Sequence, residues 1–287
     1  LVGNLHIQGG DAFDSGGISR WSIKGSDLGL SSRSLEANFG SQGQWNIGLG
    51  YDELKHQLSD TYQTPYLGSN GGNSFSLPAG FGAVPTAPAG STTINLTTAQ
   101  KAMFQTMGID SGRKNTFFSA GLGLNKQTEI KFEFNRLDQS GAKLMGFGAT
   151  KIGLSTGEAV SILPNPTNYQ TDTFNLALNW NTDKGHLTGA YHGSLFREGY
   201  DRIRFQSYAG AITDQTMSTM PSNQFHQFSL AGGYTLAAKT KVVGSVSYAR
   251  NTQNDAYVVD PIMYVPGSTA TGNKLSSLNG LVVNTHA

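Results

Sequence analysis

Hydrophobic and polar residues alternate one by one along much of this chain. In QWNIGLGYDE, residues 44–53, the apolar side chains are Trp45, Ile47, Leu49 and Tyr51, and the positions between them are polar or glycine. Successive side chains of a β-strand point to opposite faces, whereas a helix brings together every third or fourth residue. The pattern therefore predicts a strand with one apolar and one polar face.

The same alternation recurs further along the chain, at 128–135, 173–180, 186–195, 227–236 and 242–248. Three charged residues in a row, Glu129, Lys131 and Glu133, lie on the polar face of the first of these segments. A strand packed into a protein core seldom carries three charges on its other face. We therefore expect the polar face to be in contact with water.

The links between these strands are alternately short and long. Tight turns are expected at 40–43, 125–128, 181–185 and 237–240, and long segments rich in Gly, Ser, Pro and Thr at 54–112, 138–168, 197–221 and 252–274. Transmembrane barrels have short turns on the periplasmic side and long loops outside, whereas Greek-key sandwiches mix the lengths. We predict an all-β fold, an antiparallel up-and-down transmembrane β-barrel with about ten or eleven strands in this chain.

The placement of aromatic residues supports the membrane interpretation. Trp45 and Trp180 stand one or two positions from a short turn, and Tyr51 and Tyr248 stand about eight residues from theirs. Amphipathic rings favour the two membrane–water interfaces, although aromatic residues are common in strands of any kind. The spacing predicts two aromatic girdles.

A short helical pattern interrupts the long segment 54–112. In TTAQKAMFQTMG, residues 97–108, Ala and two Met recur every fourth residue from position 99. A threonine at either of the first two positions can cap the helix, and Gly108 can end it. We expect a short helix on the extracellular side, folded over the barrel mouth or against a partner.

Composition narrows the function. The chain of 287 residues has 37 glycines, 14% charged residues and a formal net charge of +1. No segment gathers a basic stripe, which argues against a nucleic-acid partner. Because the chain has no cysteine, it cannot form disulfides, zinc–thiolate sites or the C-x-x-C-H attachment of c-type haem. Any haem must belong to a partner.

Motifs for catalysis are weak. GLSTG at 153–157 matches the nucleophile elbow G-x-S-x-G, but no helical pattern follows it. The sequence contains neither H-E-x-x-H nor G-x-x-x-x-G-K, and its six histidines show no metal-binding spacing. We predict no catalytic, cofactor-binding or metal-binding residues in this chain and no enzymatic activity.

Three segments resemble the MtrB/PioB family of outer-membrane β-barrels. They are YDELKHQLSDTYQTPYLG with SFSLPAGF (51–68 and 74–81), LPNPTNYQTDTFNLALNW with GHLTGAYHGSLFREGYDRIRF (163–180 and 185–205), and MPSNQFHQFSLAGGYTLAAKTKVVGSVSYARNTQNDAY (220–257). The motif residues are Asp52, Glu53, Leu54, His56, Pro65, Pro166, Tyr169, Thr171, Tyr191, Ser194, Phe196, Pro221, Asn223, Gln253 and Asn254. Each segment is moderately specific, but the three stand in the order of the family.

The resemblance implies a function. Barrels of this family are porin-like sheaths that enclose a periplasmic multihaem c-type cytochrome, so that electrons pass between the cell interior and an extracellular acceptor or donor. For this chain it implies the bacterial outer membrane, surrounding lipid, haem c carried by the partner, and an extracellular multihaem cytochrome as a further partner. Family members have many more strands, so we expect residues 1–287 to be the N-terminal part of a single barrel domain.

Polar side chains on the water-facing side are the candidate contacts with that cytochrome. They are Gln44, Asn46, Glu129, Lys131, Glu133, Asn175, His186 and His192. A closed barrel would keep the polar guest out of hydrocarbon, where each unsatisfied backbone group costs several kcal/mol. The same residues would also suit the water-filled pore of a diffusion porin for small solutes. In a third interpretation, the apolar faces form the core of a soluble β-sandwich or adhesin.

Overall fold

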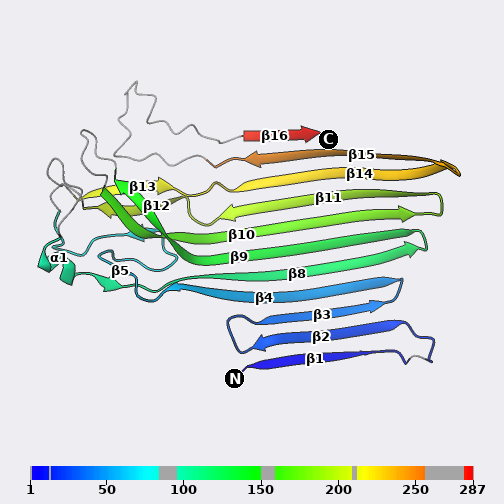
Figure 1. The fold of residues 1–287 in the computed structure, drawn as a ribbon, viewed down its shortest axis with the longest axis horizontal. Helices are drawn as coiled ribbons and strands as arrows, with labels where there is room; N and C mark the ends of the chain where they lie inside the picture. The colour runs from blue at the N-terminus through cyan, green and yellow to red at the C-terminus, as the bar shows by residue number, and fades with distance from the viewer. Residues whose placement is uncertain are drawn as a thin grey trace.

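One large antiparallel sheet makes up most of the molecule (Figure 1). The computed structural model describes residues 2–12, 14–83, 96–149, 159–208, 212–255 and 281–286. Eleven strands pair in the order β1 (Gly3–Gly10), β2 (Ser19–Leu28), β3 (Ser34–Ser41), β4 (Trp45–Ser59), β8 (Ile109–Asn125), β9 (Thr128–Ala149), β10 (Ala159–Asn181), β11 (Gly185–Glu198), β14 (Asn223–Ala237), β15 (Thr240–Gln253) and β16 (Leu281–His286). This up-and-down order confirms the predicted architecture.

Smaller elements lie in the links between these strands. The strands β6 (Ser74–Phe75), β12 (Arg202–Ser207) and β13 (Thr213–Ser218) form a three-stranded sheet, and β5 (Gln63–Thr64) pairs with β7 (Gln105–Thr106). The helix α1 (Thr98–Ala102) has five residues. All of these lie at the end of the large sheet where the long links are, to the left in Figure 1.

Alternating side chains determine how the strands pair. Trp45 lies opposite Leu122 in the register of β4 and β8, so apolar side chains of neighbouring strands share one face. Gly50 lies opposite Phe117 on the other face, and a Cβ at position 50 would come within 1.9 Å of the Phe117 ring. The ring occupies the space that glycine leaves, which is a known way of stabilising glycine in strands.

Tight turns join the strands at the other end of the sheet. The structure has hairpin turns at all four predicted places, and Gly43 in the first of them has a φ of 75°. The regular alternation of short and long links fails near the N-terminus. There, the link 11–18 on the side of the tight turns is longer than the link 29–33 on the opposite side.

Strands continue into segments that we predicted as loops. The strand β4 runs to Ser59 and β8 begins at Ile109, while β9 and β10 pair over most of 138–168. Backbone hydrogen bonds hold such extensions together whether or not their side chains alternate, which is why hydropathy alone underestimates strand length. Most of the predicted loop 252–274 lies outside the described residues.

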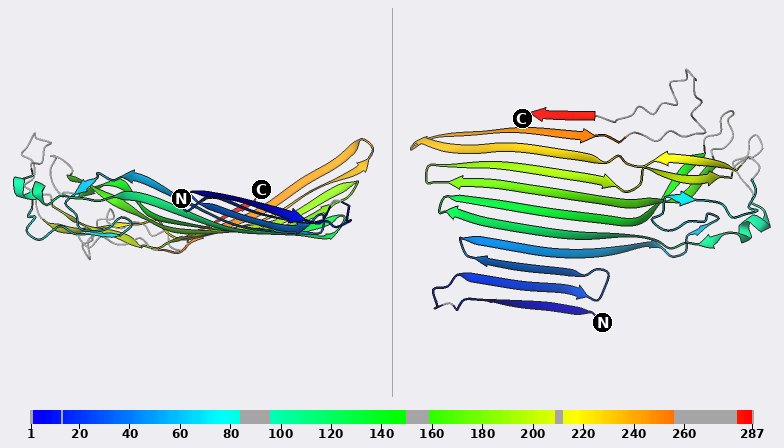
Figure 2. Two further views of the ribbon diagram at one scale, coloured as in Figure 1. Left: turned by 90° about the horizontal axis from the view of Figure 1, so that it is seen from below. Right: turned by 180° about the vertical axis from the view of Figure 1, so that it is seen from behind.

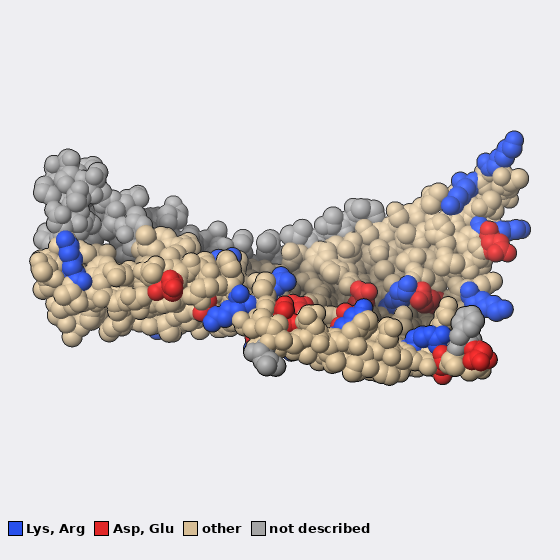
Figure 3. All heavy atoms as spheres, turned by 60° about the horizontal axis from the view of Figure 1, so that its bottom comes forward, with Lys and Arg blue, Asp and Glu red and all other residues tan. Residues whose placement is uncertain are grey.

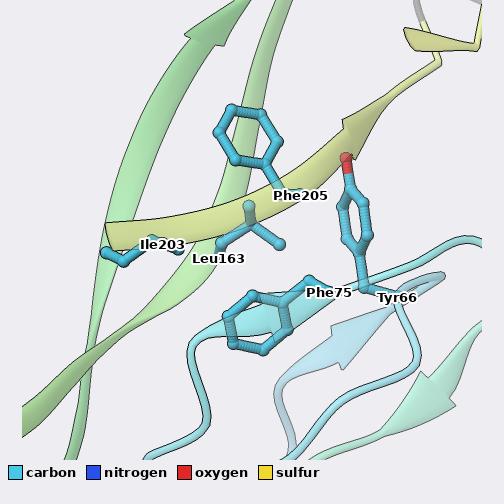
Figure 4. Packing of buried hydrophobic residues seen from close by; sticks show 5 residues of the cluster. All are labelled: Tyr66, Phe75, Leu163, Ile203 and Phe205. Carbon is cyan, nitrogen blue, oxygen red and sulfur yellow. The ribbon is translucent and has the colours of Figure 1, made fainter. Parts of the chain in front are cut away.

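The long links fold into a compact loop unit, which we define as residues 60–83, 96–108, 199–208 and 212–221. Its core consists of Tyr66, Phe75, Ile203 and Phe205 together with Leu163 of β10, each no more than 5% exposed (Figure 4). The core joins the link after β4 to β10 and β12, which are far apart in the sequence. The long links therefore build a hydrophobic core against the loop end of β10.

The predicted helix is present but shorter than expected. Thr97 caps α1, since its hydroxyl accepts the N–H of Gln100 at 3.1 Å and the Gln100 side chain accepts the Thr97 N–H at 2.9 Å. The helix ends at Ala102, with Met103 as its C-cap, rather than at Gly108, because the residues that follow pair with β5 as β7. In Figure 1, α1 lies at the far end of the loop unit. Its contact with a partner stays a prediction.

The large sheet is a single curved layer (Figure 2). Its surface is hollowed like a trough, with charged side chains along it (Figure 3). Near the tight turns, a hollow of about 1230 Å³ is lined mostly by polar-face and turn residues, among them Arg20, Ser22, Asn38, Asn46 and Glu129, and in part by Trp21, Phe39 and Trp45. The polar face is therefore concave and the apolar face convex.

Candidate functional site

The register brings the predicted polar residues together on the concave face. One row across five neighbouring strands consists of Ser119, Glu133, Asn175, His192 and Gln227. The next row towards the tight turns contains Asn46 and Lys131, and Glu129 and His186 lie nearer still to the turns. All of the candidate contacts except Gln44 thus lie on strands of one face.

Gln44 is the exception, because it belongs to the turn that precedes β4. Its side-chain Oε1 accepts a hydrogen bond from the Ser41 hydroxyl at 3.2 Å, and its carbonyl oxygen accepts the Gly123 N–H at 2.7 Å. The alternation along residues 44–53 predicted that Gln44 lies on the polar face of the strand. The hairpin instead places it at the rim of the hollow near the turns.

A chain of hydrogen bonds crosses three strands of the concave face. The Asn175 amide donates to Glu133 Oε2 at 3.4 Å, and Asn175 Oδ1 lies 2.6 Å from His192 Nδ1. Since an amide oxygen can only accept, Nδ1 is the donor in this hydrogen bond, and the other ring nitrogen, Nε2, takes no part in it. The chain orients a carboxylate, an amide and an imidazole that a polar guest could contact.

Small residues occupy much of the same face. The row that contains Asn46 and Lys131 continues through Gly40, Gly121, Ala177, Ala190, Ser229 and Ser247. The Asn46 amide occupies the space beside Gly121, because a Cβ there would lie 2.4 Å from Asn46 Oδ1 and would have to displace it. Another backbone can approach such a wall closely. The sequence analysis did not predict this row of small residues, although Gly, Ala and Ser recur at the polar positions of the strands.

The convex face carries a band of exposed apolar side chains. All three tryptophans, Trp21, Trp45 and Trp180, lie on this face near the tight turns and are 37–41% exposed. Tyr51 and Tyr248 lie on it towards the loop end. Large apolar side chains that remain this exposed over several strands indicate a surface in contact with lipid.

Charged residues follow directly beyond this band at the loop end. The carboxylate of Asp172, which is 2% exposed, accepts hydrogen bonds from Arg136 at 2.7 and 2.9 Å and from Arg197 at 2.8 Å. A second group joins Glu53 to Arg33 at 2.8 Å and to Lys114 at 4.0 Å. Sequence reasoning did not find these groups, because their members lie on different strands.

The motif residues converge at the loop end of the sheet. Asp52, Thr171, Phe196, Asn223 and Gln253 belong to a single row across the concave face. Leu54, His56, Tyr169 and Ser194 lie on β4, β10 and β11 on the same face, whereas Glu53 and Tyr191 lie on the convex face. Pro166 is on β10, Pro65 is buried in the loop unit, and Pro221 and Asn254 flank the strands.

Within the described ranges, no three His, Asp or Glu side chains are placed to hold a metal ion. Nor is any helix in that part of the chain long and apolar enough to cross a membrane. The GLSTG motif at 153–157 lies outside the described residues.

Comparison with known proteins identifies the family. The sequence model of the outer membrane β-barrel porins MtrB/PioB matches residues 9–287. Outer membrane protein MtrB of Shewanella baltica (strain OS185) is 26% identical over 231 residues, which are 75% of this chain and 29% of that protein. The chain thus spans less than a third of the length of that relative.

Two solved structures match this chain at low TM-scores. In-vitro folded OmpT of Vibrio cholerae, in its trimer form, has a TM-score of 0.33 at 8% identity over 98% of this chain and 64% of OmpT. The monoaromatic hydrocarbon channel CymD has a TM-score of 0.24 at 9% identity over 88% of this chain and 74% of CymD. With the family match over nearly its whole length, the chain belongs to the MtrB/PioB family of outer membrane β-barrel porins.

Proposed function

We propose that the concave face lines the inside of a porin-like sheath that encloses a periplasmic multihaem c-type cytochrome and so supports electron transfer across the outer membrane. Membership of an outer-membrane porin family supports the location and the barrel. The observation that carries the proposal is the wall itself, which combines small residues with oriented polar groups. A wall of this kind suits a protein guest, whose backbone and side chains need close approach and hydrogen-bond partners.

The chemistry of each face of the sheet matches its proposed surroundings. The convex apolar band meets lipid, and the concave face offers hydrogen-bonding partners to the guest, so no polar backbone is exposed to hydrocarbon. The chain has no cysteine for covalent haem attachment, which supports a haem c that is carried by the cytochrome. The proposed sheath encloses and insulates that cytochrome and does not itself catalyse a reaction. We further propose that an extracellular multihaem cytochrome docks on the loop unit, whose buried core gives it a defined surface.

Purification of the full-length protein from outer membranes tests the proposal. We expect a red complex with a c-type haem spectrum, in which the cytochrome and the barrel elute together from size exclusion in stable proportion. A colourless barrel that conducts ions freely in planar bilayers would contradict the sheath and indicate a diffusion porin.

A matched pair of substitutions on β11 makes the test specific to the concave face. Ala190 belongs to this face, and the neighbouring Gly189 to the convex face, where a Cβ would touch only a Leu230 methyl group at 3.9 Å. Ala190→Trp should place an indole against the guest and reduce the haem that purifies with the barrel at least about fivefold, roughly 1 kcal/mol of binding. Gly189→Trp should leave the haem content unchanged. Equal haem content in both variants would contradict contact of the guest with this wall.

A further inference from the structure

Basic residues line the loop-side edge of the lipid-facing band. Five basic residues share the convex face over three neighbouring rows, and we call them together the basic row: Arg33, Lys114 and Arg197, then Arg136, and then Arg250 beside the band. Three acidic residues lie in the same three rows, namely Glu53, Asp138 and Asp172, and in the next rows towards the loops Lys55 and Asp110 pair with each other at 3.0 Å. Five cations against three anions leave an excess of positive charge on a surface that faces lipid rather than the lumen.

The centre of the row is prearranged to bind an anion. Asp172 is buried and holds Arg136 through Nε and Nη2 and Arg197 through Nη1, so both guanidinium groups are fixed side by side. The arginine side chains themselves remain 42% and 49% exposed. The three residues together carry one net positive charge, and the hydrogen bonds to Asp172 use only some of the guanidinium N–H groups.

The position of the row selects the ligand. Phe134 and Phe174 lie in the adjoining row of the apolar band with ring centroids 5.1 Å apart, and the Arg136 guanidinium carbon lies 5.9 Å from the Phe134 ring centroid. A lipid whose acyl chains contact this band would bring its headgroup level with the arginines. Guanidinium groups bind phosphate through paired hydrogen bonds, and basic clusters at a membrane edge bind anionic headgroups.

We propose that the basic row, centred on Arg136 and Arg197, binds the phosphate groups of lipid A in the outer leaflet of the outer membrane. Long loops of outer-membrane barrels are extracellular, which places the row at the level of that leaflet. The proposal concerns the convex face, so it holds or fails whether or not a cytochrome occupies the concave face.

Binding of defined lipids to the full-length protein in detergent tests this proposal. The probes are diphosphoryl lipid A, the same lipid with its phosphates removed, and inorganic phosphate as a competitor, with bound lipid counted by native mass spectrometry. The triple variant R136Q/D172N/R197Q removes the charges without leaving a buried carboxylate unpaired. The control K184Q/K239Q removes two cations from the tight turns at the opposite end of the sheet.

We expect the triple variant to bind diphosphoryl lipid A roughly tenfold more weakly, about 1.4 kcal/mol, and the control to bind like the native protein. Dephosphorylated lipid A should not distinguish the three proteins. A variant R136K/R197K, which keeps the charges and the pairing with Asp172, should lose about threefold because lysine lacks the planar fork; it covers the case in which the triple variant does not fold. Undiminished binding by folded variants, an equal loss in the control, or displacement of lipid A by equimolar inorganic phosphate would each overturn the proposal.

Discussion

Replacing Phe75 by alanine should open the loop unit while leaving the large sheet intact. Phe75 is 1% exposed and packs in the core with Tyr66, Leu163, Ile203 and Phe205. Truncation of a buried phenylalanine costs about 3–5 kcal/mol, because the transfer energy of the ring is lost and a cavity remains. The loop unit has one small core, so this loss is large compared with its local stability.

Hydrogen exchange measured by mass spectrometry can test this prediction on the full-length protein. Because each 1.4 kcal/mol is a factor of ten, amide exchange in β6, β12 and β13 should accelerate by roughly 10² to 4 × 10³. Exchange in the centre of β10 and β11 should not change. The control Leu67→Ala removes a neighbouring side chain that is 45% exposed and should cost less than about 1 kcal/mol.

Two results would refute the reasoning. If exchange in the loop unit stayed slow in the Phe75 variant, the core would not be what holds the unit together. If the central strands of the large sheet accelerated by the same factor, the loop unit and the sheet would unfold as one cooperative body rather than separately.

Three further predictions concern single residues. Glu198 ends β11 next to the loop unit, outside the membrane-spanning part of the strand, and burial raises the pKa of its carboxyl to about 7. Because this folded pKa is raised, the region around Glu198 should lose stability as the pH rises from about 4.5 to 7. Glu198→Gln should abolish that slope in hydrogen exchange measured against pH. Gly141 has a φ of 100°, and a Cβ there would lie 2.2 Å from the Asp110 carbonyl oxygen. Gly141→Ala should therefore lower the midpoint temperature of the change in gel mobility that occurs when the barrel unfolds on heating. An unchanged midpoint temperature would show that the backbone relaxes. Asp172→Asn leaves two arginines without their carboxylate and should lower the free energy of unfolding in urea by about 3 kcal/mol. The control Asp201→Asn, at a side chain that is 65% exposed, should lower it by less than about 1 kcal/mol. Equal losses would show that burial of Asp172 is unimportant.

Local patterns determined the architecture of the large sheet. The side chains of a strand alternate with a period of two whatever it pairs with, so the faces of β4, β9, β10 and β11 could be predicted from the residues alone. The tight turns are also local, since a few residues decide them. For the same reason, the candidate contacts Asn46, Glu133 and His192 could be assigned to one face before their neighbours were known.

Tertiary structure decided what depends on residues far apart in the chain. Asp172 meets Arg136 and Arg197 only because the register of β9, β10 and β11 aligns them, and no local pattern specifies a register over 36 and 25 residues. The core of the loop unit depends on residues that are even farther apart in the sequence. The Tyr66 hydroxyl donates a hydrogen bond to the Gln206 carbonyl, 140 residues away. The helix α1 ends early because its last predicted turn pairs as β7 instead. Alternation is therefore sufficient to predict the two faces of the sheet, but contacts between distant segments are needed to build the basic row and the loop unit.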